Sequence, residues 1–165
     1  MGGARSGKSA YAIKLTKEAR RNVLFLATAF ASDEEMSRRI RLHKRNRPAG
    51  WKTIEVQKGL PSVLKGTSEK IGLIVIDCLT LYISNLILND RTDAQIENEM
   101  KLVLKLLKNS NSDSIVVSNE VGLGIVPDNP LARKFRDLAG RINQKVAHCA
   151  DRVYFMAAGI PVGLK

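Results

Sequence analysis

The chain has 165 residues, of which 44% are hydrophobic and 26% charged, a composition typical of one globular domain spanning residues 1–165. No run approaches the roughly 18 apolar residues of a membrane span and no basic-then-apolar signal segment opens the chain, so we expect a cytoplasmic protein without a membrane span. The net charge of +11 indicates either a surface for nucleic acid or a pocket for small polyanions such as nucleoside triphosphates. Because aromatic residues make up only 5% and no nucleic-acid-binding motif is found, we expect no nucleic-acid partner.

A phosphate-binding motif stands at the start of the chain. Residues 2–9 read GGARSGKS and match G-x-x-x-x-G-K-[ST], the P-loop. In such a loop the glycines let backbone N–H groups turn toward phosphate oxygens, the lysine adds a charge at the β- and γ-phosphates, and the serine offers a hydroxyl to Mg²⁺. A chance glycine-rich turn before a helix is the alternative. We expect the whole loop to bind nucleotide: Gly2, Gly3, Ala4, Arg5, Ser6, Gly7, Lys8 and Ser9.

Strands and helices alternate along the rest of the chain. Near-continuous apolar runs, typical of strands covered on both faces of a parallel sheet, predict strands at 23–28, 71–76, 114–118 and 152–156. Apolar residues at helical spacing predict helices at about 33–46, 92–108 and 131–149. Thr92 and Gln95 have the spacing of a capping box at the start of the second. The alternation predicts an α/β fold with a mostly parallel sheet and helices on both faces.

The helix at 33–46 carries a histidine among many basic residues. Six basic residues surround His43 in the sequence: Arg38, Arg39, Arg41, Lys44, Arg45 and Arg47. Since nearby positive charge disfavours a charged imidazole, we expect a neutral, nucleophilic ring near pH 7. The same charges suit a triphosphate. The alternative is a solvated basic helix with an incidental histidine.

Two carboxylates follow predicted strands, at the edge where α/β sheets hold ligands. Asp77 comes directly after the strand at 71–76, and we expect it to hold Mg²⁺ or its water shell; the alternative is a helix N-cap. Glu120 follows the strand at 114–118 by two residues. It is a candidate for the metal or a substrate hydroxyl, with a hydrogen bond that braces its own loop as the alternative.

The cysteines and histidines predict no structural zinc site. Cys78 and Cys149 are far apart and share no metal-ligand spacing with His43 or His148. We expect both cysteines to be buried, reduced thiols.

Taken together, these segments resemble one family, the bifunctional adenosylcobinamide kinase / adenosylcobinamide-phosphate guanylyltransferase. The resemblance covers nearly the whole chain in order. The matching stretches are GGARSGKS (2–9), DEEMSRRIRLHKRNRPAGWKTIE (33–55), DCLTLYISNLI (77–87), SNEVGLGIVPDNPLARKFRDLAGRINQKVA (118–147) and AGIPVGLK (158–165).

The resemblance implies a RecA-like P-loop nucleoside triphosphate hydrolase fold, ATP and GTP as substrates, and a homotrimer. It implies that a nucleoside triphosphate phosphorylates adenosylcobinamide, and that GTP guanylylates a histidine that passes GMP to adenosylcobinamide phosphate. The family histidine falls on His43, which with Lys8 becomes the catalytic pair. Arg39 and Arg47 lie four residues to either side of His43, and because Pro48 disfavours helical geometry at Arg47, Arg39 is the better nucleotide-binding candidate.

The chain departs from the family pattern at two places. Family members carry a short apolar strand ahead of the P-loop that is missing here, so we expect a weakened sheet and a mobile P-loop. Some members have two adjacent histidines where this chain has Leu42 and His43. The rival interpretations are a P-loop small-molecule kinase without guanylyltransferase activity and a basic nucleic-acid-binding module.

Overall fold

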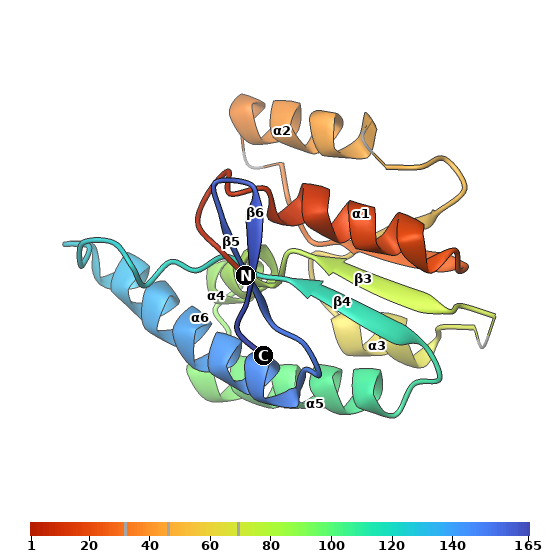
Figure 1. Cartoon of the computed structure of the whole chain (residues 1–165). Helices are drawn as coiled ribbons and strands as arrows, with labels where there is room; N and C mark the ends of the chain where they lie inside the picture. Colours follow the sequence, from red (N-terminus) through yellow and green to blue (C-terminus); the bar gives the residue numbers. More distant parts are fainter. Residues whose placement is uncertain (32, 46, 69) are drawn as a thin grey trace.

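The computed structural model describes residues 1–31, 33–45, 47–68 and 70–165, with the side chain of Arg39 outside the description (Figure 1). Its elements in chain order are α1 (Lys8–Ala19), β1 (Val23–Ala27), α2 (Glu34–Arg45), β2 (Lys52–Glu55), α3 (Leu60–Lys65), β3 (Leu73–Asp77), α4 (Leu79–Leu88), α5 (Asp93–Lys108), β4 (Asp113–Val117), α6 (Pro130–Cys149), β5 (Tyr154–Ala157) and β6 (Ile160–Gly163). The predicted α/β fold is confirmed. The three predicted helices are α2, α5 and α6, and α5 begins with the predicted capping box of Thr92 and Gln95.

The main sheet has four parallel strands in the order β2-β1-β3-β4. Its register aligns the last residues of three strands, because Ala27 pairs with Asp77 and Asp77 with Val117. The loops that follow β1, β3 and β4 therefore leave the sheet at one edge, where ligands of α/β proteins bind.

Alternate side chains of the strands face two separate cores, as a pleated sheet requires. Leu24, Leu26, Ile74 and Ile76 belong to the larger core, which they share with α3, α4, α5 and α6. The intervening residues, such as Phe25 and Val75, face the opposite side, where α1 contacts β3 and β4. Figure 1 shows α1 on one side of the sheet and α3 and α5 on the other. The predicted covering of both faces is confirmed.

The fourth predicted strand, 152–156, does not join the parallel sheet, so that prediction was wrong. Its residues form most of β5, which pairs antiparallel with β6. The chain reverses through Ala158 and Gly159, whose φ angles of 50° and 85° suit the two-residue turns of β-hairpins. A hydrophobic run predicts a strand but not the strand with which it pairs. Here the turn brings the next segment of the chain, β6, beside β5 as its partner.

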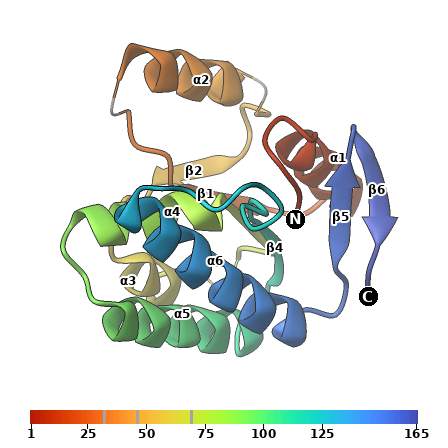
Figure 2. The same ribbon diagram turned by 90° about the vertical axis from the view of Figure 1, so that its left-hand side faces the viewer.

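The first two residues connect the hairpin to the main sheet. The backbone N–H of Met156 donates to Met1 O at 2.8 Å, and that of Glu120 donates to Gly2 O at 2.9 Å. Met1 also donates to Tyr154 O at 2.6 Å. Residues 1 and 2 therefore lie between the loop after β4 and the β5–β6 hairpin, and Figure 2 shows the N-terminus beside β5. The mobility of the P-loop stays a prediction.

The two cysteines differ in their surroundings. Cys78 is buried and Cys149 is exposed, so the prediction that both are buried was wrong for Cys149. It belongs to the last turn of α6, beyond Asn143, the last residue that this helix buries. Across the described ranges, no helix combines the length and hydropathy needed to cross a bilayer.

The open edge of β4 generates a stability prediction. Adding about six apolar, β-branched residues ahead of Met1 should raise the melting temperature by about 3 °C or more, the shift that ~1 kcal/mol produces in a chain of this size. The added strand would pair with β4, the edge strand of the main sheet among the described residues, and supply partners to its outer backbone groups. Calorimetry would measure the shift against a glycine-serine extension of equal length, and equal melting temperatures would contradict the prediction.

Candidate nucleotide site

The P-loop leads into α1 through a backbone that needs glycine at two positions. Gly2 has a φ of 149°, and a Cβ there would lie 2.6 Å from Met156 O. Gly7, the N-cap of α1, has a φ of 91°, and a Cβ there would lie 3.2 Å from the Cα of Gly159. A Cβ on Gly3 would meet no atom within 4 Å, so the predicted need for glycine holds for Gly2 and Gly7.

The side chain of Lys8 folds over the loop that precedes it. Its Nζ donates to the carbonyl oxygen of Gly3 and, at 3.3 Å, to Ser6 Oγ. Burial lowers the pKa of Lys8, while the nearby Cys78 and Asp77 act in the opposite direction. A phosphate oxygen in the loop would be a stronger, charged acceptor for this ammonium than the neutral oxygens it now contacts. Ala4 and Arg5 are exposed at the outer side of the loop.

Ser9 and Asp77 meet at the carboxyl edge of the sheet. Ser9 Oγ in the first turn of α1 donates to Asp77 Oδ1 at 3.2 Å. The N-cap of α4 is Cys78, so the alternative of Asp77 as a helix cap is wrong. Burial raises the pKa of the Asp77 carboxyl, against the hydrogen bond from Ser9 and the positive charges of His43, Arg47 and Lys8.

This pair of oxygen donors fits Mg²⁺. A hydroxyl and a carboxylate are hard ligands, and Mg²⁺ in nucleotide enzymes takes one or two protein groups together with phosphates and waters. Among the described residues, no three or more histidine, cysteine, aspartate or glutamate side chains gather as a metal cluster. Ser9 and Asp77 are the residues that would hold the ion beside a bound nucleotide.

Thr28 positions the backbone at Asp77 and was missed by sequence reasoning. It is fully buried directly after β1, and its N–H donates to Asp77 O at 3.1 Å. Its Oγ1 donates to Cys78 O at 2.6 Å, and its own carbonyl accepts from Asn85 Nδ2 at 2.8 Å. The available signal was a hydroxyl residue ending an apolar run, at the same sheet edge as Asp77.

His43 lies on α2, which Figure 2 shows above β1 and β2. Its ring is exposed, two residues before the last residue of the helix, and lies close enough to Asp77 to lower the pKa of that carboxyl when the ring is protonated. The structure thus brings His43, Lys8, Ser9 and Asp77 to one edge of the sheet. The side chain of Arg39, the predicted phosphate contact on this helix, lies outside the described residues.

Arg47 lies beyond the end of α2. Helical spacing in the sequence favoured Arg39 as the nucleotide-binding residue, but the structure makes Arg47 a candidate as well. Its guanidinium carbon stands 4.2 Å from the ring centroid of Phe25, on which Trp51 also stacks at 6.0 Å. Burial lowers the pKa of Arg47, against the carboxylates of Asp77 and Glu55. Its Nη1 is buried with no hydrogen-bond partner among the described residues. A buried donor of this kind is costly unless an acceptor reaches it, and an anionic ligand supplies one.

Glu120 braces the loop that follows β4. Its Oε1 accepts from the N–H of Gly122 at 2.8 Å, the bond expected from the alternative interpretation, and its own N–H holds Gly2. Arg136 adds a bond to Gly122 O at 3.0 Å from α6. These bonds place a half-buried carboxylate beside the start of the P-loop; a contact with nucleotide or metal stays a prediction.

Comparison with known proteins gives concordant matches along the chain. Residues 1–164 match the family described as cobinamide kinase / cobinamide phosphate guanyltransferase. The chain is similar to the bifunctional adenosylcobalamin biosynthesis protein CobP of Pseudomonas aeruginosa, with 42% identity over 165 residues, 100% of this chain and 95% of that protein. It is 38% identical to CobU of Salmonella typhimurium and 35% identical to CobU of Escherichia coli, both named bifunctional adenosylcobalamin biosynthesis proteins, in each case over 176 aligned residues, 99% of this chain and 97% of that protein.

The raised pKa of Asp77 generates a prediction that separates stability from activity. Asp77→Asn should lower nucleotide-dependent turnover by about 100-fold or more. It should leave the nucleotide-free protein at pH 7 as stable as the native protein or more so, because a neutral amide carries less desolvation cost than a buried carboxylate.

The pH dependence has a defined sign. A carboxyl with a raised pKa holds more protons in the folded than in the unfolded chain, so native stability falls as pH rises from about its ordinary pKa of 3.8 through the raised value. Urea melts between pH 4 and 7 should lack this component in Asp77→Asn and keep it in Asp113→Asn, a change at an exposed aspartate of β4. A markedly less stable Asp77→Asn protein at pH 7 would contradict the prediction.

The unpartnered Nη1 generates a prediction about Arg47. Arg47→Ala should weaken binding of a fluorescent GTP by about ten-fold, because a charge-assisted bond to the ligand is lost. Arg47→Lys should recover little of this affinity, since an ammonium lacks the planar group that stacks on Phe25. Arg91→Ala, at an exposed position between α4 and α5, is the control for charge. Fluorescence anisotropy measures all three, and unchanged affinity in Arg47→Ala would refute this role.

Proposed function

This chain belongs to the cobinamide kinase / cobinamide phosphate guanyltransferase family, and we propose that it catalyses both reactions at the P-loop edge of its sheet. In the first, a nucleoside triphosphate phosphorylates the aminopropanol hydroxyl of adenosylcobinamide. In the second, GMP passes from GTP through His43 to adenosylcobinamide phosphate, giving adenosylcobinamide-GDP and pyrophosphate. The observation that carries the proposal is the contact of Ser9 Oγ with Asp77 Oδ1 at 3.2 Å, beside Lys8 and within the electrostatic reach of His43.

The kinase step depends on groups that bind and neutralise phosphates. Backbone N–H groups of the P-loop and the N-terminus of α1 would donate to the phosphate chain, and Lys8 would turn from its loop acceptors to the β- and γ-phosphates. Mg²⁺, when bound, supplies further positive charge to the transferring group. Ser9 and Asp77 would hold it, and Thr28 keeps the Asp77 backbone in place.

The guanylyl transfer uses His43 as a nucleophile. A neutral ring nitrogen attacks the α-phosphorus of GTP, an N–P bond forms, and the bond to the pyrophosphate oxygen breaks. A phosphate oxygen of adenosylcobinamide phosphate then attacks that phosphorus, and the N–P electron pair returns to the imidazole. Lys8 and Arg47 lie close enough to act on Asp77 and are the cations available to stabilise the charge that develops.

We also propose that the chain acts as one domain, in the cytoplasm, and assembles as a homotrimer, as the family resemblance implies. The loop after β4 supports an association surface. Leu123, Ile125 and Val126 on this loop are 78%, 96% and 60% exposed, a run of apolar surface that a monomer seldom presents to water.

Labelling tests the proposed intermediate. Native protein incubated with GTP labelled at the α-phosphate should acquire acid-labile label, and His43→Ala should acquire none. His148→Ala removes the other histidine, exposed on α6, and should label like the native protein. Phosphorylation of adenosylcobinamide by γ-labelled ATP, measured in parallel, reports the kinase step. Kinase activity without label in the native protein would reject the guanylyltransferase and favour a simple P-loop kinase.

A further inference from the structure

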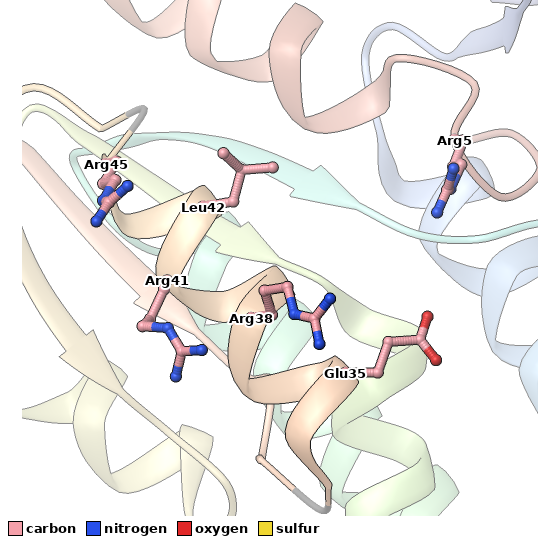
Figure 3. A pocket seen from close by; sticks show the side chains of 6 residues that line it. All are labelled: Arg5, Glu35, Arg38, Arg41, Leu42 and Arg45. Carbon is pink, nitrogen blue, oxygen red and sulfur yellow. The ribbon is translucent and has the colours of Figure 1, made fainter.

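A second basic site lies beside the nucleotide site. A cavity of about 590 Å³ separates the outer side of the P-loop from α2 and is lined by Arg5, Glu35, Arg38, Arg41, Leu42 and Arg45. Figure 3 shows Arg5 on the P-loop and the other five side chains on α2, with Arg38 and Glu35 extending on the side nearer Arg5. The volume is within the range of ligand pockets.

The described residues that line this cavity carry an excess of positive charge. Four arginines and one glutamate line it. Within the described ranges, Arg5, Arg41 and Arg45 form no ion pair, and Arg38 has only a 3.9 Å contact with Glu34, with both side chains largely exposed. Surface pairs of that kind contribute little. Like charges that converge on one cavity repel, and a bound anion removes that repulsion.

This cavity is distinct from the groups that would hold the nucleotide. Lys8, Ser9 and Asp77 do not line it. Arg38, Leu42 and Arg45 recur at intervals of four and three residues and so share a face of α2, whereas His43 lies about 100° around the helix from Leu42. The cavity is therefore next to the nucleophile but opens on another side of its helix.

We propose that this cavity is the subsite for the phosphate of the guanylyl acceptor, adenosylcobinamide phosphate; the inference rests on the proposed function. In the second step, a phosphomonoester dianion must approach a phosphorus that already carries negative charge on His43. An oxygen–phosphorus bond forms, the N–P bond breaks, and the electron pair returns to the ring. Arg41 and Arg45, one turn apart and unpaired, neutralise the incoming phosphate, while Leu42, 59% exposed, contacts the adjoining apolar part of the acceptor.

A single-turnover experiment tests the subsite apart from nucleotide binding. The double variant Arg41→Ala/Arg45→Ala is first guanylylated with α-labelled GTP, a step called charging below, and then freed of excess nucleotide. Transfer of the label to adenosylcobinamide phosphate is then measured at increasing concentrations of that acceptor. Charging should proceed as in the native protein, and the acceptor concentration at half-saturation should rise about ten-fold or more. Both changes place the good helix former alanine at exposed helical positions, so the fold is retained.

The matched control is Lys101→Ala/Lys105→Ala on α5. This pair is also exposed, four residues apart on a helix, and removes the same two charges. It should leave the acceptor concentration at half-saturation within two-fold of the native value.

Several outcomes would overturn the subsite. One is unchanged half-saturation in the arginine variant; another is loss of charging, which would assign the cavity to GTP. An equal rise in the KM for unphosphorylated adenosylcobinamide in the kinase step would show that the cavity recognises another part of the acceptor. Failure of the native protein to charge at all would instead reject the proposed function, so the two failures are distinguishable.

Discussion

The placement of the nucleotide site depends on two backbone hydrogen bonds at the start of the chain. Gly2 O accepts from Glu120 N–H at 2.9 Å, and Met1 O accepts from Met156 N–H at 2.8 Å. These bonds hold the P-loop between the loop after β4 and the β5–β6 hairpin. From that position α1 starts beside β3, and its first turn carries Ser9 to Asp77. A Cβ at Gly2 would lie 2.6 Å from Met156 O, so the close approach of this segment to β5 requires glycine at the first position of the loop.

Electrostatics at this edge favour a ligand that brings negative charge and a metal ion together. Asp77 is held in surroundings that raise its pKa, and Lys8 and Arg47 in surroundings that lower theirs. Desolvation disfavours the charged form of each group, and each would find a complement of opposite charge in a magnesium nucleotide. Groups perturbed in this way cluster at functional sites. The buried, unpartnered Nη1 of Arg47 belongs to the same pattern.

Sequence periodicity predicted the parts of the fold that depend on local pattern. The helices α5 and α6 and the strands β1 and β3 were predictable, because each buries an apolar face or run. The predicted helix α2 and strand β4 also form, although no described residue of α2 is buried and only Val117 of β4 is. The run at 152–156 failed as a member of the main sheet, since its partner is set by the turn at Ala158 and Gly159 rather than by its own residues. The exposure of Cys149 was not predicted because the last turn of α6 extends beyond the core, where the helix buries no residue after Asn143.

In the site, too, the residues of local sequence motifs were predictable, whereas a role that depends on tertiary contacts was not. Motif spacing placed Lys8 and Ser9 in the P-loop and Asp77 at a strand end, and the structure brings them together. Helical spacing favoured Arg39 over Arg47, since Pro48 argues against a helix at Arg47. The tertiary contacts of Arg47 need no helix: Phe25, twenty-two residues earlier, supplies the aromatic face on which its guanidinium rests. No local pattern carries that information.

The position of α2 relates the proposed nucleophile to the basic cavity, because both lie on this helix. One helix carries His43, the proposed nucleophile, and on another face an arginine row that shares a cavity with Arg5 of the P-loop. A transfer between two phosphate-bearing substrates needs positive charge on both sides of the transferring group. In the proposed function, Lys8 and Arg47 supply it on the nucleotide side, and the α2 arginines supply it on the other. Two small anions bound beside one histidine would then account for the excess of basic residues in this chain, and a nucleic-acid surface is not required to explain it.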